Sequence, residues 1–418
     1  MRFDLGWRDV AFGVRSMCAR LDRDALNRRI RECWPRPEQM VPFLSVRSGF
    51  DLLWASLDLP PGSEVLMSAL TIPDMVRIVE HHGLLPVPVD LNAANMAPEL
   101  NAIRRAITPA TRAIVVAHLF GTRVLLEPIL EIARQHGLLV IEDCAQAFDG
   151  CHDDGHPNAD VTMFSFGPIK TITALGGGVL CVRNAELLAK IESLHGLYPV
   201  QSRGSYLKRF TKYSVLMGLS SRPLCDAILA MYRAAGFDYD HWINGVVRAF
   251  PGPGWLEGLR HQPSAPLLAM LERRLRMFNP AWITARIARA QHLIRRLPAG
   301  VVRPGSAARD NSYWVFPVLA DDPGRLAAEL AEAGFDTTRG GSLRPVEPPE
   351  DRPELDPKTA RRILAGMVFM PLCPQMPRRE IERLAGVLGQ LEDCLIIDPT
   401  KVEPPKIFPR TVVDVRSG

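Results

Sequence analysis

The chain has 418 residues, with 50 Lys and Arg against 46 Asp and Glu, so its formal net charge is +4 at pH 7. Hydrophobic residues make up 47% and charged residues 23%, which is typical of a globular protein and excludes a disordered chain. At about 150 residues per domain, this length predicts two or three domains. So small a net charge produces no overall electrostatic field that would attract nucleic acid, and we expect no nucleic-acid partner.

The eight cysteines are scattered and none forms a CxxC pair, which argues against a disulfide scaffold or a cysteine zinc site and favours a reducing compartment. The first residues mix charges with apolar side chains, unlike a secretory signal. No run of about 18 uncharged apolar residues occurs, which argues against an ordinary membrane span. We therefore expect a cytoplasmic protein.

Short apolar runs alternate with amphipathic stretches between residues 43 and 182. The predicted strands are 64–68, 84–89, 112–119, 137–143, 160–166 and 177–182, and the predicted helices are 73–82, 98–107 and 124–136. Strands separated by helices predict an α/β fold with a mostly parallel sheet sandwiched by helices. Ligands bind at the carboxyl ends of such strands, which directs attention to Thr71, Asp90, His118 and Asp143.

The remaining pattern predicts further units. Helical signal returns at 265–297, a Pro- and Gly-rich linker follows, and strand and helix patterns then alternate again. We therefore divide the chain into an N-terminal helical segment (1–40), a large domain with a helical insertion from about residue 196 (41–245), connecting helices (246–297), a smaller C-terminal α/β domain (298–396) and a tail (397–418).

Three features of the large domain bear on chemistry. Asp143 ends the apolar strand in VIEDCAQA, Lys170 lies in a turn between two strands, and Ser48-Gly49 precede the helical pattern FDLLWASL. An aldehyde cofactor with a pyridine ring and a phosphate needs an amine to condense with, an acid at the ring nitrogen and a helix N-terminus for the phosphate. Singly, each feature has a structural explanation, such as a solvated lysine or a helix-capping aspartate. Together they favour a cofactor site.

Longer motifs occur in a characteristic order: SVRSGFDLL, ALTIPD, PVPVDL, AITPATRAIVVAHLFG, LLVIEDCAQAFDG, MFSFGPIKTITALGGG, YWVFPV and MPLCP. On these motifs the chain resembles the DegT/StrS-type sugar aminotransferases, which are fold type I enzymes that use pyridoxal 5′-phosphate (PLP). The resemblance runs from about residue 41 to residue 391, with a poor middle. It implies a large PLP-binding domain, a smaller C-terminal domain and a homodimer.

The resemblance also implies roles for single residues. Lys170 matches the lysine that forms a Schiff base with PLP and shuttles the proton, and Asp143 matches the partner of the pyridine nitrogen. Gln146 matches a contact to the ring hydroxyl side, and Ser165, Ser48 and Gly49 match the phosphate pocket. Related dehydratases carry His where the aminotransferases carry Lys, so Lys170 favours transamination.

By the same resemblance, the donor is an amino acid, glutamate or glutamine, and the acceptor is a keto group of a nucleotide-activated sugar or related cyclic ketone. Two alternatives stay open: a non-catalytic or regulatory relative that binds ligand without turnover, and other PLP chemistry on the same scaffold.

Several positions depart from the family pattern. Ile72 stands where the family often stacks an aromatic residue on the cofactor ring, and the run 175–178 lacks a glutamate but keeps its glycines. The segment 196–262 lacks an Asn-Tyr-Arg motif that contacts the neighbouring subunit's cofactor phosphate. Arg260 and Ser264 are candidates for the missing contacts.

Two further stretches allow more than one interpretation. Residues 208–236 combine basic and large apolar side chains, which suits a membrane surface, a wall for a lipid-linked acceptor, an extra helical layer or a dimer contact. The CHDDGH stretch (151–156) has the residue types of a metal site, but such Asp- and Gly-rich loops are usually solvated turns, so we expect no metal.

Overall fold

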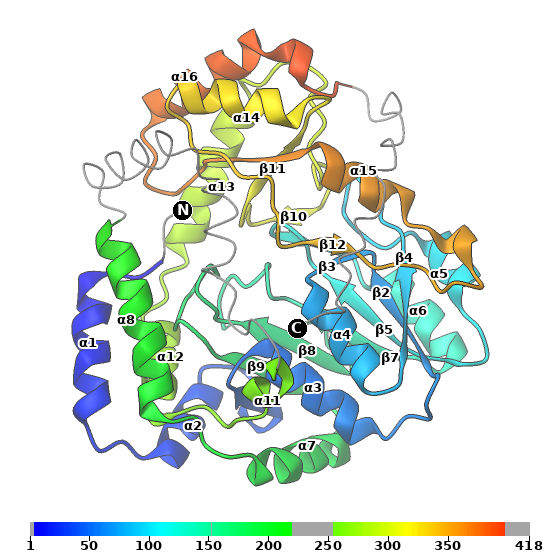
Figure 1. Cartoon of the computed structure of the whole chain (residues 1–418), viewed down its shortest axis with the longest axis vertical. Coiled ribbons are helices and arrows are strands. Elements are labelled where there is room, and N and C mark those ends of the chain that lie inside the picture. Colours follow the sequence, from blue (N-terminus) through cyan, green and yellow to red (C-terminus); the bar gives the residue numbers. More distant parts are fainter. Residues whose placement is uncertain (1–3, 152, 220–253, 398–418) are drawn as a thin grey trace, which may run out of the picture.

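The computed structural model describes residues 4–151, 153–219 and 254–397. Within these residues seven strands form a central sheet in the order β1-β9-β8-β7-β5-β2-β4 (Figure 1). Their bounds are β1 Met40–Phe43, β2 Glu64–Ser68, β4 Leu85–Val89, β5 Thr111–Ala117, β7 Leu139–Asp143, β8 Val161–Ser165 and β9 Gly178–Val182. The five neighbouring strands β8, β7, β5, β2 and β4 are parallel to one another. Strand β9 runs antiparallel to both of its neighbours, β8 and β1. The predicted α/β fold with a mostly parallel sheet is confirmed.

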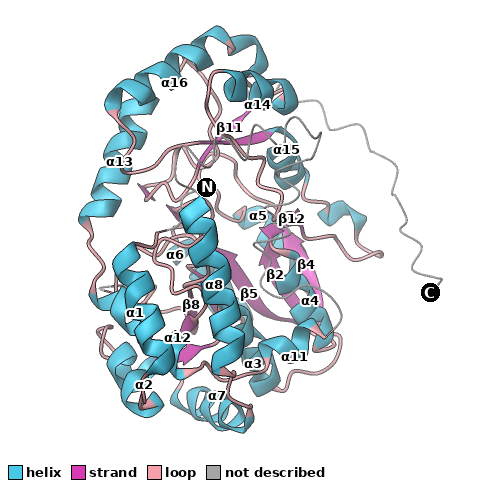
Figure 2. Ribbon diagram, turned by 60° about the vertical axis from the view of Figure 1, so that its left-hand side comes forward, coloured by secondary structure: helices cyan, strands magenta, loops and turns pink. Residues whose placement is uncertain are grey.

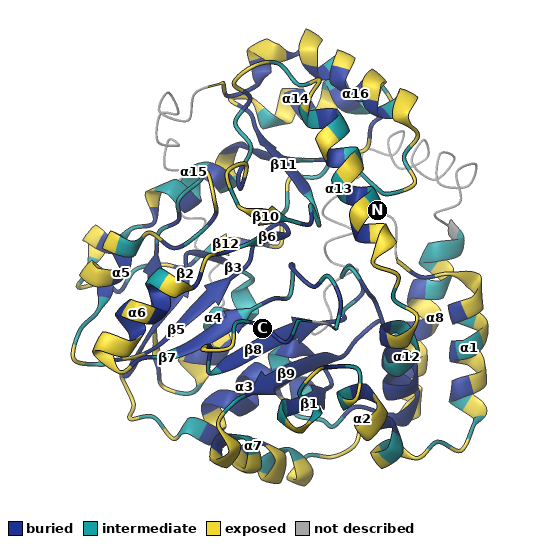
Figure 3. Ribbon diagram, turned by 180° about the vertical axis from the view of Figure 1, so that it is seen from behind, coloured by how far each residue is buried: buried dark blue, intermediate teal, exposed yellow. Residues whose placement is uncertain are grey.

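Helices cover both faces of this sheet, because its strands are apolar on both sides. In β5, Val115 packs on one face, and its neighbours Ile114 and Val116 pack on the other. The first face is covered by α3 (Val46–Leu57), α4 (Pro73–His81) and α7 (Ala185–Leu197). The second is covered by α5 (Leu100–Ala106) and α6 (Glu127–His136), and at the β1 end by α2 (Arg23–Arg31) and α12 (Ala265–Arg276). The strands are accordingly buried almost throughout (Figure 3).

An outer helical layer lies beyond α12. Helices α1 (Trp7–Cys18) and α8 (Arg203–Leu219) contact each other and both pack against α12 (Figure 2). The short helix α11 (Trp255–Leu259) packs near α3. Of the helical insertion expected from about residue 196, the segment 220–253 lies outside the described residues, as does nearly all of the expected tail at 397–418.

A second, smaller unit pairs β11 (Phe316–Leu319) with β13 (Met367–Met370) in antiparallel fashion. Its helices are α13 (Ala281–Ile294), α14 (Pro323–Glu332), α15 (Lys358–Gly366) and α16 (Arg378–Gln390). Two small ladders tie it to the large unit: β3 (Leu70–Thr71) pairs with β12 (Arg344–Pro345), and β6 (Thr122–Arg123) pairs with β10 (Asp310–Asn311). Short 3-10 turns lie at Pro37–Gln39, Pro353–Leu355 and Glu392–Cys394.

Over the described parts of the chain, no helix combines the length and the apolar character needed to cross a bilayer.

Candidate active site

Lys170 lies in the loop that joins β8 to β9, at the edge between the two units. Its backbone N–H donates to the Gly167 carbonyl oxygen at 3.1 Å, so the chain turns tightly just before the side chain. The Nζ atom lies 4.9 Å from the ring centroid of Trp314, whose Nε1 donates to the Ile169 carbonyl oxygen at 3.2 Å. One aromatic residue of the smaller unit therefore contacts both the lysine loop and the lysine amine.

The environment of Lys170 shifts its protonation toward the neutral amine. Burial lowers the pKa of Lys170 from 10.5 to about 8; the charge of Asp143 opposes this shift and that of Arg47 adds to it. A neutral amine is the form that attacks a carbonyl carbon, so this shift suits a nucleophile working near neutral pH.

Asp143 ends β7 and faces the same region. Its Oδ1 accepts the Ala145 N–H at 2.9 Å, while Oδ2 accepts no hydrogen bond from the described residues. Burial raises the pKa of Asp143, and the Ala145 N–H together with the charge of Lys170 pulls it back down. Because each side chain shifts the pKa of the other, the carboxylate and the amine lie within electrostatic reach.

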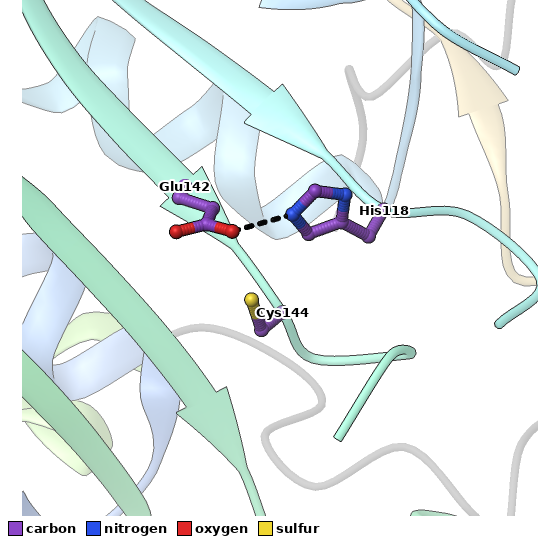
Figure 4. Close-up of side chains that lie close together, drawn as sticks. All are labelled: His118, Glu142 and Cys144. Atoms are coloured by element: carbon purple, nitrogen blue, oxygen red, sulfur yellow. Dashed lines mark hydrogen bonds and ion pairs between the residues drawn. The ribbon is translucent and has the colours of Figure 1, made fainter. Parts of the chain in front are cut away.

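A buried pair supports the end of this strand (Figure 4). His118 Nδ1 accepts the Val124 N–H at 2.9 Å, so the ring proton sits on Nε2 and is donated to Glu142 Oε1 at 2.8 Å. Glu142 Oε2 also accepts the His156 N–H and the Thr162 hydroxyl. Burial alone would raise the pKa of Glu142, but the hydrogen bonds from His118 and the His156 backbone N–H, with the charge of Arg123, lower it to about 2.

The same pair belongs to the one group of described residues with the spacing of a metal site. The ligand atoms of His118, Glu142 and Cys144 lie within 4.8 Å of one another. Both ring nitrogens and both carboxylate oxygens already take part in hydrogen bonds, so a cation would have to displace the shared proton. The pair instead links the ends of β5 and β7 beside Asp143, where the backbone N–H of His118 also donates to the Asp143 carbonyl oxygen at 3.0 Å.

The start of α3 forms the opposite side of the region. Ser45 caps the helix: its Oγ accepts the Ser48 N–H at 3.2 Å and lies 2.9 Å from the Ser48 Oγ. Arg47 lies two residues after this cap, and its guanidinium is ion-paired with Asp74 at the start of α4. The helix therefore presents its N-terminal dipole, a buried hydroxyl and a cation at one point.

The glycine run after Lys170 brings the lysine loop against this helix end. Gly177 has φ +89° and donates its N–H to the Leu44 carbonyl oxygen at 2.7 Å. A Cβ atom on Gly178 would lie 2.3 Å from the Val46 nitrogen, which leaves no room for a side chain. The expectation that these glycines keep a particular backbone path thus has a physical cause.

The other sequence-predicted residues take up distinct places. Ser165 ends β8, is buried, and pairs in register with Gly178. Gly49 lies where a Cβ atom would come 2.4 Å from a Leu180 methyl carbon, so it lets α3 pack closely on β9. Gln146 Oε1 accepts the Phe120 N–H at 2.8 Å, which holds a residue with φ +62°. Ile72 precedes α4 and is half-buried.

The two candidates for the missing phosphate contacts are engaged elsewhere. Arg260 donates from Nε and Nη2 to the two carboxylate oxygens of Asp51, at 2.9 and 3.0 Å, and His82 contacts the same carboxylate. Ser264 is buried and donates to Gln201 Oε1 at 2.9 Å. Arg260 thus ties the end of α11 to α3, and Ser264 ties the start of α12 to the segment that precedes α8.

Sequence reasoning missed three residues that the structure brings to the lysine loop. Arg47 lies inside the SVRSGF motif and Trp314 inside YWVFPV, so both were visible in matching stretches without an assigned role. Arg286 of α13 donates to the Ser312 carbonyl oxygen at 2.6 Å and contacts Thr171 Oγ1 at 3.5 Å. It lies outside every matching motif, and only the fold reveals it.

The two carboxylates of the CHDDGH stretch are paired with arginines. Asp153 pairs with Arg123 at 2.7 Å, and Asp154 pairs with Arg36 through both carboxylate oxygens. His152 lies outside the described residues. This loop is thus anchored by ion pairs to neighbouring parts of the large unit.

The donor set assembled at this edge fits PLP by its chemistry. A buried amine of lowered pKa would meet the aldehyde, and a strand-end carboxylate with an available oxygen would meet the ring nitrogen. The N-terminus of α3 with Ser48 and Arg47 would meet the phosphate.

Comparison with known proteins agrees with this chemistry. Residues 40–222 match the sequence profile of the DegT/DnrJ/EryC1/StrS aminotransferase family. Residues 40–222 are therefore similar to the DegT/DnrJ/EryC1/StrS aminotransferase family, and we call them the family segment. The residues matched to the lysine, ring and phosphate contacts all fall inside the family segment, whereas the candidates Arg260 and Ser264, as well as Arg286 and Trp314, fall outside it.

Two curated relatives show how far the family likeness extends. The UDP-N-acetyl-3-dehydro-alpha-D-glucosamine 3-aminotransferase of Acidithiobacillus ferrooxidans is 38% identical over 231 residues, 51% of this chain and 61% of that protein. The UDP-4-amino-4-deoxy-L-arabinose–oxoglutarate aminotransferase of Shewanella sediminis is 33% identical over 164 residues, 38% of this chain and 42% of that protein. The chain thus matches less than two thirds of the length of either relative.

A solved structure extends the likeness in fold to most of the chain. The PLP form of a putative sugar aminotransferase, Spr1654 of Streptococcus pneumoniae, superposes with a TM-score of 0.67, covering 94% of this chain and 97% of its own. The sequences are 15% identical, so this comparison establishes the fold. The fold is that of the PLP fold type I aminotransferases, as the sequence predicted.

Proposed function

We propose that the protein is a PLP-dependent aminotransferase that moves an amino group from an amino acid to the keto group of a nucleotide-activated sugar or related cyclic ketone. The observation that carries the proposal is Lys170, an amine with its pKa lowered to about 8, held over Trp314 within the field of Asp143. A lysine in a surface loop would have none of these three features.

Bound PLP would supply an electron sink for the carbanion that forms at the donor's Cα. Lys170 would attach the cofactor covalently and, once displaced by the donor, would carry the proton from Cα through its neutral Nζ. Asp143 Oδ2 would accept the hydrogen bond of the protonated ring nitrogen and keep that proton in place. His118 and Glu142 would hold the two strand ends, so that the carboxylate keeps its direction.

The phosphate of the cofactor would bind where α3 begins, at Ser48, Gly49 and Ser165, with the charge of Arg47 nearby. Gln146 would contact the hydroxyl side of the ring. Ile72, just before α4, would supply an aliphatic face to the ring where an aromatic residue is common. These assignments follow the family motifs. The phosphate contacts are supported by the position of Ser48 and Gly49 at the start of α3 and of Ser165 at the end of β8, which leads into the lysine loop.

For the substrates, the names of relatives support a nucleotide sugar as acceptor: both curated relatives are named for UDP-linked sugars. One name includes oxoglutarate, the keto acid that glutamate leaves behind, which supports glutamate as the donor. We further propose, from the family resemblance, a cytoplasmic homodimer with two active sites.

The test is a half-reaction followed by absorbance. Purified protein loaded with PLP should lose the absorbance of the attached cofactor when glutamate or glutamine is added, and should regain it when a keto acceptor is added. Screening nucleotide-linked keto sugars against the donor-reduced protein identifies the acceptor. A protein that takes up PLP but never responds to any amino donor would instead be a non-catalytic relative.

A further inference from the structure

Helix α1 carries an apolar stripe on its outer side, in addition to the residues that it packs against the core. Trp7, Ala11, Val14 and Cys18 follow a helical spacing along one face, and all four are exposed. Trp7 is 68% exposed and Val14 55%. The inner side carries the buried Asp9, Gly13 and Ser16, together with Val10, Phe12 and Met17, which pack partly buried against the core. The helix thus keeps a second apolar stripe, Trp7, Ala11, Val14 and Cys18, on the side that faces away from the core.

This orientation is fixed by contacts on the buried side. Asp9 accepts hydrogen bonds from Arg273 Nε at 3.0 Å and Arg274 Nη1 at 2.9 Å, both on α12. A Cβ atom on Gly13 would lie 2.2 Å from the ring of Phe210, so α8 approaches the helix at this glycine. Rotating α1 to bury its stripe would break a partly buried ion pair and a close helix contact, at considerable cost.

Helix α8 continues the same surface. It runs antiparallel to α1: Gly218 lies beside Trp7, and Arg203 Nη1 donates to the carbonyl oxygens of Met17 and Ala19. Its exposed side carries two large apolar residues, Leu207 and Val215, which are 44% and 53% exposed. We name the exposed residues of these two helices the α1–α8 face; the helices lie side by side in Figure 2.

The charge of the α1–α8 face has one sign. Its charged members are all basic: Arg8, Arg15, Arg203, Lys208 and Lys212. The sequences of α1 and α8 contain a single acid, Asp9, which is buried and paired with the arginines of α12. Large apolar side chains between cations, with no exposed acid on either helix, are the pattern of an interfacial helix.

We propose that the α1–α8 face binds the surface of an anionic phospholipid bilayer, with Trp7, Val14, Leu207 and Val215 among the headgroups and the basic residues at the lipid phosphates. A second copy of the chain fits this face less well. In a two-fold dimer, the five basic residues of one copy would face the same five basic residues of the other copy. Tryptophan is also a favoured residue at a membrane interface. This inference is independent of the proposed function.

Vesicle flotation tests the proposal with the purified 418-residue chain. We expect it to float with vesicles that contain phosphatidylglycerol, to remain behind with pure phosphatidylcholine vesicles, and to lose binding as salt rises. Each of Lys208→Gln and Lys212→Gln should weaken the partition about fivefold. The double variant Trp7→Gln/Val14→Gln should weaken it by more than tenfold.

Matched control variants distinguish binding through the α1–α8 face from non-specific binding of the protein surface to vesicles. Leu125→Gln/Leu197→Gln removes two residues that are 58% and 78% exposed on other parts of the surface, and Arg104→Gln/Arg105→Gln removes two cations of α5. Both controls should float as the unchanged protein does. Circular dichroism of each variant checks that it folds.

Three results would overturn the proposal: no flotation, equal flotation with neutral vesicles, or equal losses in the test and control variants. Sedimentation velocity tests the other possible partner of this face, a second copy of the chain. If Trp7→Gln/Val14→Gln converts a dimer into monomers and the unchanged protein does not float, the face is an interface between copies.

Discussion

Lys170 and Trp314 are in direct contact: the Nζ atom lies 4.9 Å from the indole centroid, and the indole N–H donates to the carbonyl oxygen of the residue before the lysine. The two side chains come from different units of the fold, 144 positions apart in the sequence. The smaller unit therefore helps to place the amine on which the account depends, although it lies outside the family segment.

Replacing this tryptophan should weaken cofactor binding. Trp314→Leu removes both the ring face and the indole N–H, and we expect the PLP dissociation constant to rise about tenfold, the size of one cation–π contact with one hydrogen bond. Trp314→Phe keeps a ring and should show a smaller loss. Fluorescence titration with PLP measures both. Equal affinity in all three proteins would show that the contact plays no part in binding.

Attachment of PLP should depend on pH through Lys170. Because burial lowers the pKa of Lys170 to about 8, the rate of attachment should rise with pH to a midpoint near that value and level off above it. Arg47→Gln removes a positive charge that lowers this pKa, so its midpoint should lie at higher pH. Stopped-flow absorbance gives both profiles. A midpoint near 10.5 would mean that the amine is solvated.

Asp143→Asn should uncouple attachment from turnover. The amide cannot hold the ring nitrogen in its protonated form, so we expect the donor half-reaction to slow about a hundredfold or more. Lys170 is unchanged, and PLP should still attach. Single-turnover absorbance after addition of glutamate measures the step. Asp160→Asn is an unsuitable control because its carboxylate holds the Val140 N–H; the exposed Asp58→Asn should react normally.

The His118–Glu142 pair should contribute pH-dependent stability. Since the pKa of Glu142 falls from 4.5 to about 2 on folding, its contribution is complete above pH 4.5 and is lost as the pH falls toward 2. The shift corresponds to about 3 kcal/mol. The gap in unfolding free energy between the natural protein and Glu142→Gln should therefore shrink over that range, as urea titrations would measure. A gap that stays constant with pH contradicts this assignment.

Gly178→Ala should destabilise the protein where β9 packs against the start of α3. The new methyl group would lie 2.3 Å from the Val46 nitrogen, and backbone cannot yield as a flexible side chain does. We expect a loss of about 1–3 kcal/mol in unfolding free energy. Gly386→Ala in α16 meets nothing within 4 Å and should be neutral or slightly stabilising. If both variants unfold alike, the close approach of β9 to α3 is not a constraint.

The sequence predicted the central strands well, because apolar runs between turn residues and amphipathic helices leave a strong local signal. The predicted strand 64–68 coincides with β2, and 137–143 differs from β7 by two residues. Strand β1 was missed. It is four residues long, contains Pro42 and lies at the sheet edge, where a proline is tolerated but the strand pattern is weak.

The site was less predictable where its contacts join distant parts of the chain. Motif order identified Lys170 and Asp143, since each lies beside a strand that the pattern already placed. Nothing local indicates that Arg260 would meet Asp51, which lies 209 positions earlier, or that Arg286 would reach the loop after Lys170. The exposed stripe of α1 also escaped notice, because an apolar periodicity normally predicts a buried face.

The most direct test of the central claim is chemical trapping of the lysine. The purified protein is incubated with PLP, reduced with borohydride, digested and analysed by mass spectrometry. The account predicts one phosphopyridoxyl adduct on the peptide that contains Lys170, and none at this position in Lys170→Ala. A stoichiometric adduct on another lysine, or no adduct at all, would contradict it.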